Sequence, residues 1–582
     1  MSNFMMQDTN ATKALGWKRP LTGWLWFAGW GLLIATLAVL IRLILGAVTG
    51  KSDDALLWLL AIGIALASAL VIGLAIQCLS SWRNFKRFLI SLCCLAGLIA
   101  LFYAEEDVRG KLAWDHFKTK WETKGEKFDF SAFIPPKVPE DQNFAMTPLV
   151  AGTYSRILDR NGHKVSPQNT NVVNRLDMPL EANGNGPTNG IGNWQKGIGS
   201  DLEVWQRYYR KLALSTNLFP VPAQPQTPAA DVLLALSKYD STIEELRRDA
   251  ALPQSRFPLN YDAEEVFTIL LPHLAPLKGS AVVLRLRALA EIQAGQSQKA
   301  LDDVGLALSC TGKIRSEPFL ISQLVRIAMV LITEQSIWQG LETHCWSDAQ
   351  LSQLDQQLAA LDFVADYERA IRAENTCQVS ATEFLRRHRD ELRNLGEDVD
   401  NGAMSVEDIP AHLMPSGWFY QNELRGSKFI FEQCLPIGNV AQQTIAPGLV
   451  KEADASLDAM PFGPYTMVCK LLLPSLPNCA RKFAFGQAAV NLARTGCALE
   501  RYRLAQGRYP DALDALAPQF IGKVPRDPVG GEALHYHAID DRHFVLYSIG
   551  WNAKDDSGTV SLTKSGSVDL DNGDWVWRYA EK

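Results

Sequence analysis

The first hundred residues contain three long apolar stretches, whereas the rest of the chain mixes apolar and polar positions. The stretches cover residues 21–46, 55–78 and 88–103. The second has 24 residues and no charge, which is long enough for a helix to cross the roughly 30 Å of bilayer hydrocarbon. We therefore predict three transmembrane helices within residues 21–103. The alternative for each stretch is a buried helix in a large soluble core.

The charges that flank these stretches predict how the chain crosses the membrane. Basic residues precede the first stretch and separate the second from the third, whereas acidic residues follow the third. They are Lys13, Lys18 and Arg19, then Arg83, Lys86 and Arg87, then Glu105, Glu106 and Asp107. Because basic flanks are retained in the cytoplasm, we expect residues 1–20 to form a cytoplasmic tail and residues 104–582 to be extracytoplasmic.

Residues 104–201 combine one amphipathic helix with extended and loop-forming segments. Apolar side chains recur at helical spacing between 108 and 121. They are Leu112, Trp114, Phe117 and Trp121. This helix either lies along the membrane surface or packs on the extracytoplasmic domain. Segment 134–139 has three prolines and should be extended, and the Asn- and Gly-rich segment 161–199 should be a loop or mobile linker.

Helical periodicity predicts a helical domain over residues 202–480. The clearest element is a hairpin of two helices over 281–309, with Gly295 at the beginning of its turn. Its small and apolar positions resemble those of a tetratricopeptide hairpin, but they do not recur 34 residues later. We therefore favour generically packed hairpins over a true repeat array. Further helices are expected over 363–395 and after Pro415.

The C-terminal residues 481–582 change from helical to strand periodicity. One long helix is predicted from small and apolar residues spaced by three and four, and it should end near Gly507. These residues are Phe485, Ala489, Leu492, Gly496 and Leu499. Two strands, 533–539 and 543–549, should then form a β-hairpin that turns near residues 540–541. The region is thus expected to be an α+β domain.

The distribution of charge excludes one class of partner. The chain has 57 Lys and Arg against 63 Asp and Glu. Residues 1–103 carry a net charge of +5, so the remainder carries −11. Nucleic acid is therefore not expected as a partner, since phosphate-backbone binding needs a basic face. The lipid bilayer and proteins of the cell envelope are the expected partners.

The C-terminal motifs resemble those of a known family. The segments ALERYRLAQGRYP, VPRDPVGG and FVLYSIGWNAKDDSG are similar to the globular part of the major pseudopilin of type II secretion systems. The whole chain looks like bacterial membrane-anchored proteins that combine such a tail with a helical domain. The resemblance implies the bacterial inner (cytoplasmic) membrane and a periplasmic ectodomain. A pseudopilin begins with its apolar helix, whereas the equivalent helix here is internal, so filament assembly by the usual route is not expected.

Two metal sites are considered in this tail. The resemblance implies calcium held by Asn552, Asp555 and Asp556, with Asp569 or Asp571 nearby; a solvated acidic turn is the alternative. Zinc could be held by three histidines if the hairpin loop has an odd number of residues. They are His535, His537 and His543. An even loop would place His543 on the opposite face from the other two, which is the arrangement we favour.

The extracytoplasmic cysteines are expected to be buried thiols, although Cys469 and Cys479 could close a short disulfide loop. No familiar catalytic motif is present: neither His-Glu-x-x-His nor Gly-x-Ser-x-Gly occurs. We therefore predict a non-enzymatic interaction or scaffold protein, with a link to a secretion or pilus-like system. The alternative is a hydrolase that uses distant carboxylates, for which Glu291 and Glu374 are nominal candidates. A deep pocket with convergent carboxylates would favour the hydrolase.

Overall fold

The computed structural model describes residues 82–154, 174–181, 186–187, 190–392, 411–474 and 476–579. The predicted membrane segments 21–46 and 55–78 lie outside these residues. The chain divides into two compact units, Met1–Glu106 and Asp107–Lys582.

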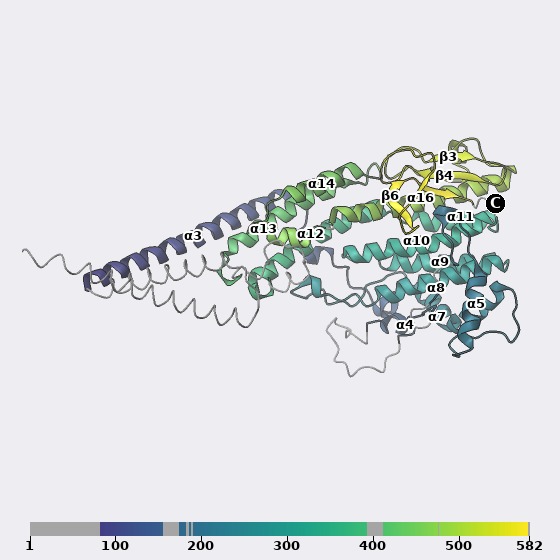
Figure 1. Ribbon diagram of the computed structural model, residues 1–582, viewed down its shortest axis with the longest axis horizontal. Coiled ribbons are helices and arrows are strands. Elements are labelled where there is room, and N and C mark those ends of the chain that lie inside the picture. Colours follow the sequence, from purple (N-terminus) through teal and green to yellow (C-terminus); the bar gives the residue numbers. More distant parts are fainter. Residues whose placement is uncertain are drawn as a thin grey trace, which may run out of the picture. The chain divides into compact units, whose positions relative to one another are not determined.

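The described residues are mainly helical, with short strands gathered near the C-terminal end (Figure 1). The helices are α3 (Trp82–Glu122), α4 (Pro148–Ala151), α5 (Leu202–Ala213), α6 (Pro228–Leu236), α7 (Asp240–Ala250), α8 (Leu274–Gln293), α9 (Ser297–Lys313), α10 (Leu320–Glu342), α11 (Asp348–Ala359), α12 (Phe363–Arg387), α13 (Ser416–Phe429), α14 (Pro447–Ala459), α15 (Met467–Leu472) and α16 (Leu476–Gln506). The strands are β1 (Gly438–Asn439), β2 (Thr444–Ile445), β3 (His535–Ala538), β4 (Phe544–Ser548), β5 (Val560–Leu562), β6 (Val568–Gly573) and β7 (Trp575–Arg578).

Two of the described helices are long and apolar enough to cross a membrane. One is Phe85–Glu122 within α3, whose most apolar window is 0% buried. The other is α10, Leu320–Glu342, whose window is 61% buried and belongs to the core. The predicted third span, 88–103, therefore coincides with an exposed apolar helix. By contrast, α10 is a buried core helix, which is the alternative that we considered for each long apolar stretch.

The part of α3 that follows residue 106 packs on the rest of the second unit. Trp114 is 6% exposed, and the Trp121 ring stacks on Phe431 with their centroids 4.8 Å apart. The backbone N–H of Gly417 donates to the Asp107 carboxylate at 2.7 Å. Of the two alternatives for the amphipathic helix, packing on the helical region that follows it in the chain is the one observed.

The predicted hairpin over 281–309 is confirmed as α8 and α9. Gly295 lies in its turn with φ at +72°, a conformation that glycine adopts without steric cost. Helices α8, α9 and α10 lie side by side (Figure 1). Ala288 of α8 and Ala300 of α9 are fully buried in one hydrophobic cluster, and small side chains of this kind let two helices approach closely.

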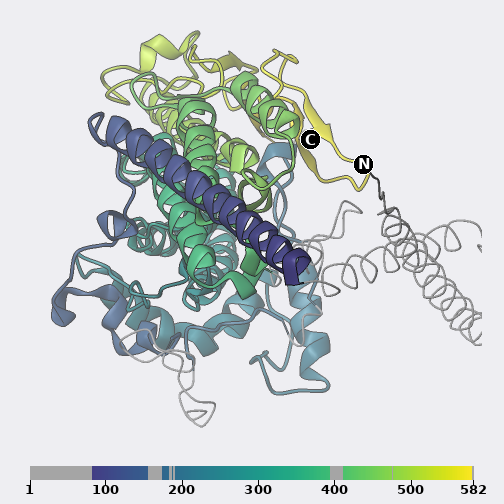
Figure 2. The same ribbon diagram turned by 90° about the vertical axis from the view of Figure 1, so that its left-hand side faces the viewer.

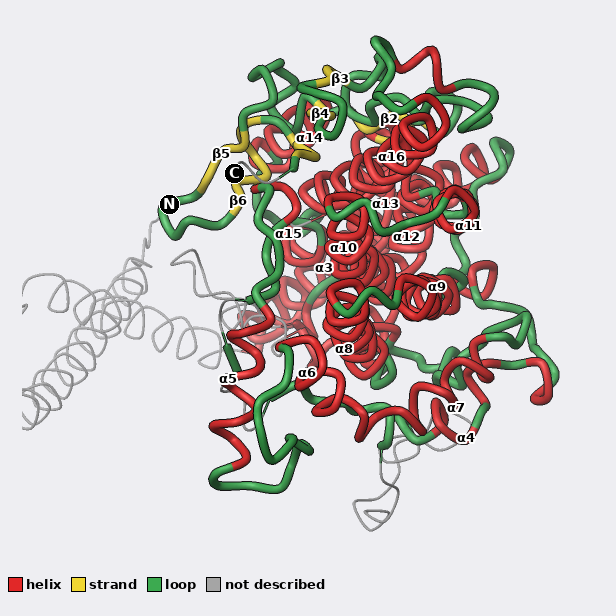
Figure 3. The backbone as a smooth tube through the Cα atoms, turned by 90° about the vertical axis from the view of Figure 1, so that its right-hand side faces the viewer, coloured by secondary structure: helices red, strands yellow, loops and turns green. Residues whose placement is uncertain are grey.

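The C-terminal region shares its core with the helical region. Helix α16 ends before Gly507, as predicted, and it packs against α10, α11 and α12. Ala480 and Phe483 belong to the same hydrophobic cluster as Trp338 of α10, so the core is continuous across the predicted boundary at residue 481. The strands of the C-terminal sheets lie toward one side of the helices (Figures 2 and 3).

The predicted β-hairpin is confirmed as antiparallel β3 and β4. Strand β7 pairs with β4 to complete a three-stranded sheet, and β5 pairs with β6 in a separate hairpin. Strand β7 and the pairing of β5 with β6 were not expected from the sequence. Strand β7 contributes Trp577, which is 0% exposed.

The Asn- and Gly-rich segment is only partly described. Residues 190–199 form loop and turn structure, as predicted, but they are fixed to the core and do not form a mobile linker. Trp194 is 6% exposed, and its ring lies 5.3 Å from that of Trp577. The pattern missed this anchor because one buried tryptophan has little weight among many turn-forming residues.

Candidate functional site

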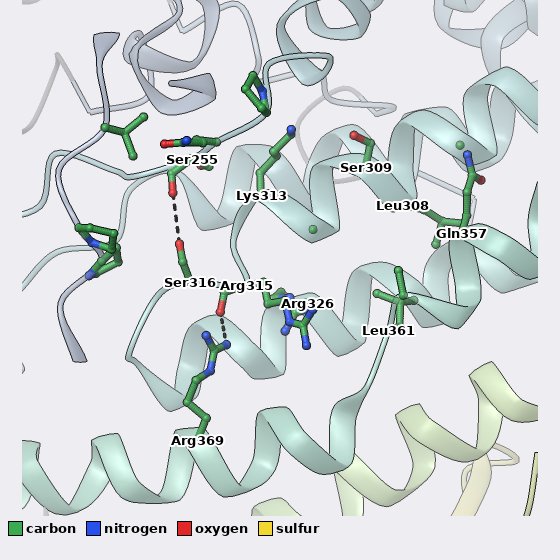
Figure 4. A pocket seen from close by; sticks show the side chains of 18 residues that line it. Ser255, Leu308, Ser309, Lys313, Arg315, Ser316, Arg326, Gln357, Leu361 and Arg369 are labelled. Atoms are coloured by element: carbon green, nitrogen blue, oxygen red, sulfur yellow. Dashed lines mark hydrogen bonds between the residues drawn. The ribbon is translucent and has the colours of Figure 1, made fainter. Parts of the chain in front are cut away.

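A cavity of about 810 Å³ lies between four helices and the proline-rich segment (Figure 4). Helices α9, α10, α11 and α12 line one side of it, and the other side is lined by Pro135, Pro136, Val138 and residues 253–255. Cavities of this size commonly bind small molecules or parts of larger ligands.

The wall opposite the helices is built by two segments that are held together by hydrogen bonds. The Asn143 carboxamide accepts from the Arg256 backbone N–H at 2.8 Å and donates to the Arg256 carbonyl at 2.9 Å. The Arg256 Nε donates to the Pro135 carbonyl at 2.8 Å. These bonds fix the predicted extended segment 134–139 beside the loop that precedes residue 257.

Helix α9 presents small residues to the cavity. Gly305, Ser309 and Gly312 recur every three to four residues, so they share one helical face. A Cβ built at Gly312 would have no other atom within 4 Å. The cavity thus reaches the backbone of α9 at this position.

Four basic side chains line the cavity, and none of its described lining residues is acidic. They are Lys313, Arg315, Arg326 and Arg369. Figure 4 shows that they come from α9, the segment after it, α10 and α12. Lys313 donates to the Leu252 carbonyl and Arg369 donates to the Arg315 carbonyl.

One carboxylate, Asp366, serves all three guanidinium groups. It lies behind the lining, 2.6 Å from Arg326 Nη1, 3.2 Å from Arg315 Nε and 3.4 Å from Arg369 Nη2. With Lys313, four positive charges therefore face one negative charge. This imbalance gives the cavity a net positive potential.

Arg326 is the buried member of this group, with 0% of its side chain exposed. Burial lowers the pKa of Arg326; the Asp366 charge opposes this effect, and repulsion from Arg315 adds to it. An arginine remains charged in proteins even so. Its Nη2 has no hydrogen-bond partner among the described residues, and neither has the Oε1 of Gln357 in the same lining. Buried polar atoms are normally satisfied, so these two indicate bonds that a bound group could make.

The structure places the predicted calcium ligands together but uses them for internal bonds. Asn552 Nδ2 donates to Asp556 Oδ2 at 2.7 Å. Asp555 accepts from the Tyr547 hydroxyl at 3.1 Å and from the Ser557 N–H at 2.8 Å. Over the described residues, no cluster of His, Cys, Asp or Glu has the arrangement of a metal site. The calcium site stays a prediction, and the turn has the contacts of its solvated alternative.

The hairpin loop is odd-numbered, contrary to the arrangement we favoured. Ala538 pairs with Phe544, and the Ile539 N–H donates to the His543 carbonyl at 2.9 Å. This register places His543 on the same face as His535 and His537. The described histidines nevertheless form no metal cluster, because His543 Nδ1 contacts Asp540 at 2.8 Å and His535 Nδ1 lies 3.4 Å from Asp555.

Asp569 and Asp571 lie on strand β6 rather than in the loop. Asp571 pairs with Arg481 of α16, and Asp569 accepts from the Asn572 side chain at 3.0 Å. Both carboxylates therefore have partners within the chain.

The two nominal catalytic carboxylates have raised pKa values but do not line the cavity. Burial, together with the nearby Asp303 charge, raises the pKa of Glu291 to about 8. Burial raises the pKa of Glu374 to about 7. They lie on α8 and α12 respectively, and neither is among the groups that shift the pKa of the other. The structure does not bring them together as an acid–base pair.

We expect Glu291→Gln to stabilise the protein at alkaline pH. The pKa of Glu291 is higher in the folded state than its ordinary value of 4.5. The free energy of unfolding of the parent protein therefore falls as pH rises from that value to about 8. Below pH 4 both states are protonated and the variant should match the parent. Above pH 8 it should gain about 1–3 kcal/mol, the usual cost of an unsatisfied buried polar group. Urea unfolding across this pH range tests it, and a pH-independent difference would contradict it.

Cys469 and Cys479, the pair proposed for a disulfide, are both free buried thiols. Cys469 contacts the Asn422 carbonyl at 3.7 Å, whereas the pKa of Cys479 responds to Glu374. The alternative of buried apolar thiols therefore describes them.

Comparison of the chain with protein-family models, with curated proteins and with solved structures finds no match. The likeness of the C-terminal region to the pseudopilin thus stays a prediction. Sequence reasoning also missed the cavity residues, because Lys313 and Arg369 are 56 positions apart and form no local motif. The one available signal was Arg326, a charge between the apolar residues Val325 and Ile327 of α10.

Proposed function

We propose that this chain is a membrane-anchored extracytoplasmic binding protein that holds an anionic group of an envelope partner in the cavity described above. The observation that carries the proposal is the excess of buried and half-buried cations around it. Three guanidinium groups share one carboxylate, and the ammonium group of Lys313 also lines the cavity. A bound anion would relieve their mutual repulsion and bond to the free Nη2 of Arg326.

The lining favours binding over hydrolysis. Acid–base hydrolysis by carboxylates requires two such groups at the substrate, and no acidic side chain lines the cavity within the described residues. Glu291 and Glu374 lie elsewhere. The interaction or scaffold role is therefore the better supported of the two functions predicted from the sequence.

The membrane anchor completes the proposal. We propose three spans in a bacterial inner membrane, with residues 1–20 in the cytoplasm and residues 104–582 outside. The exposed apolar helix Phe85–Glu122 supports the third span. A link to a secretion or pilus-like system is supported by the order of elements in the tail, where the long helix α16 precedes the antiparallel β3–β4 hairpin.

Photo-crosslinking from inside the cavity tests this function. A photoreactive alkyl diazirine of about the size of a leucine side chain, placed at Gly312, would extend into the open space without filling it, because no atom other than the adjoining backbone of α9 lies within 4 Å of the built Cβ. Irradiation of cells should attach an envelope component to this position. Gly448 is the matched control: it is also exposed and helical, and it also has open space beside its Cβ.

We expect a product from position 312 that position 448 does not give, and Arg369→Gln in the same chain should reduce it. Equal products from both positions, or none from position 312 in a protein that folds normally, would contradict a binding role for the cavity.

A further inference from the structure

We propose that the group held in the cavity is a phosphoryl group, as a monoester or diphosphate, carried by a hydroxyl-bearing moiety such as a sugar. This inference rests on the proposed binding function and specifies its ligand. It follows from the number of charges, the free donor and the neutral side chains that complete the lining.

The charge count favours phosphoryl over carboxylate. Asp366 offsets one of the four positive charges, which leaves three. A carboxylate supplies one negative charge and two acceptor atoms, whereas a phosphomonoester supplies about 1.5 to 2 charges and three acceptor oxygens near neutral pH. The planar guanidinium forks of arginines bind such oxygens in pairs. A phosphoryl group therefore matches the cavity better in both charge and donor number.

Arg326 supplies the fixed donor of this site. Its Nη1 is bound to Asp366 and Gln323, both at 2.6 Å, and its Nε donates to the Thr311 carbonyl at 3.1 Å. These bonds hold the guanidinium plane while Nη2 stays without a partner. Arg315 and Arg369 are 46% and 39% exposed, so their side chains can turn toward a ligand with little loss of packing.

The neutral lining indicates what carries the phosphoryl group. Gln357 Oε1 is a buried acceptor without a partner, so it requires an O–H or N–H donor from the ligand. Ser309 and Ser316 hydroxyls donate to the Ala250 and Ser255 carbonyls, which leaves their oxygens free to accept. Acceptors of this kind suit the hydroxyl groups of a sugar or polyol.

Calorimetric titration and thermal melting of the purified full-length chain in detergent test the ligand class. The probes are inorganic phosphate, glucose 1-phosphate, glucose and acetate, all at the same ionic strength so that general screening is constant. Glucose 1-phosphate should bind most tightly and raise Tm, phosphate should follow, and acetate should bind at least tenfold more weakly than phosphate. Dihexanoyl phosphatidic acid is a further probe. If it binds more tightly than glucose 1-phosphate, the phosphoryl group comes from a lipid; if it binds more weakly, the group comes from a soluble compound.

Two variants confine the binding to the cavity. Gly312→Trp should abolish binding of glucose 1-phosphate, because the indole would fill the open space, whereas the control Gly448→Trp should bind normally. Arg369→Gln should weaken binding about tenfold or more, which corresponds to the loss of one charge-assisted hydrogen bond.

Two results would overturn the inference: acetate binding as tightly as phosphate, or phosphate binding that Gly312→Trp leaves unchanged. If position 312 still crosslinks a partner while no phosphate compound binds, the ligand class is wrong but the binding function stands. If phosphate compounds bind but no partner is crosslinked, the cavity takes a free small molecule and the proposed role in holding a partner fails.

Discussion

Replacing Asp366 by Asn should lower the free energy of unfolding by about 3–5 kcal/mol, the usual cost of breaking a buried ion pair from one side. Among the residues that the structure describes, Asp366 is the only carboxylate within ion-pair distance of Arg326, whose side chain is 0% exposed. Without that charge Arg326 would be buried among neutral groups while Arg315 and Arg369 still repel it. Urea unfolding of the detergent-solubilised protein measures the change.

Arg326→Met is the matched control for this prediction. It removes the buried cation and leaves Asp366 paired with Arg315 and Arg369, so the loss of stability should be clearly smaller than for Asp366→Asn. Millimolar phosphate should also restore part of the stability of Asp366→Asn, since an anion in the cavity would replace the lost charge. Equal losses from the two variants would show that crowded positive charge does not govern this site.

The second large effect is expected from Trp577→Ala, which should cost about 3–5 kcal/mol. Trp577 is fully buried in β7, where its ring lies near Gly496 of α16 and Trp194. At the next residue of β7, the Arg578 carbonyl accepts from Trp338 Nε1 of α10 at 2.8 Å. Loss of the ring would therefore open a cavity where the C-terminal sheet meets the helices.

This substitution also tests whether the tail and the helical region unfold together. Because they share one hydrophobic cluster, thermal melting followed by far-UV and near-UV circular dichroism should show one coincident transition at a lower Tm. Leu562→Ala on β5 is the control, since Leu562 is 54% exposed and should change stability by less than about 0.5 kcal/mol. A separate early transition of the tail would contradict a shared core.

The sequence pattern predicted those elements that are determined by residues close to them in the chain. The turn at Gly295, the end of α16 before Gly507 and the pairing of β3 with β4 were all found in this way. The loop of that hairpin was not, because the number of loop residues depends on one hydrogen bond between Ile539 and His543. Strand β7 was missed for a related reason: Trp575 and Trp577 are buried by distant helices, and no local period shows this.

The cavity could not be predicted from the sequence because distant segments form it. The proline-rich segment was expected to be extended, but nothing in its residues shows that Arg256 holds it beside α9. The charge excess was hidden as well, since residues 104–582 as a whole are acidic. Only the fold brings Arg315, Arg326 and Arg369 to one carboxylate.

The central claim is that the cavity between α9, α12 and the proline-rich segment holds an anionic group. A cryo-electron microscopy map of the full chain, purified gently from its own membranes, tests this most directly. We predict density beside Arg326 Nη2 that also contacts Arg369 and that disappears in Gly312→Trp. An empty cavity, or an Arg326 Nη2 that donates to an acceptor of the chain itself, would contradict the account.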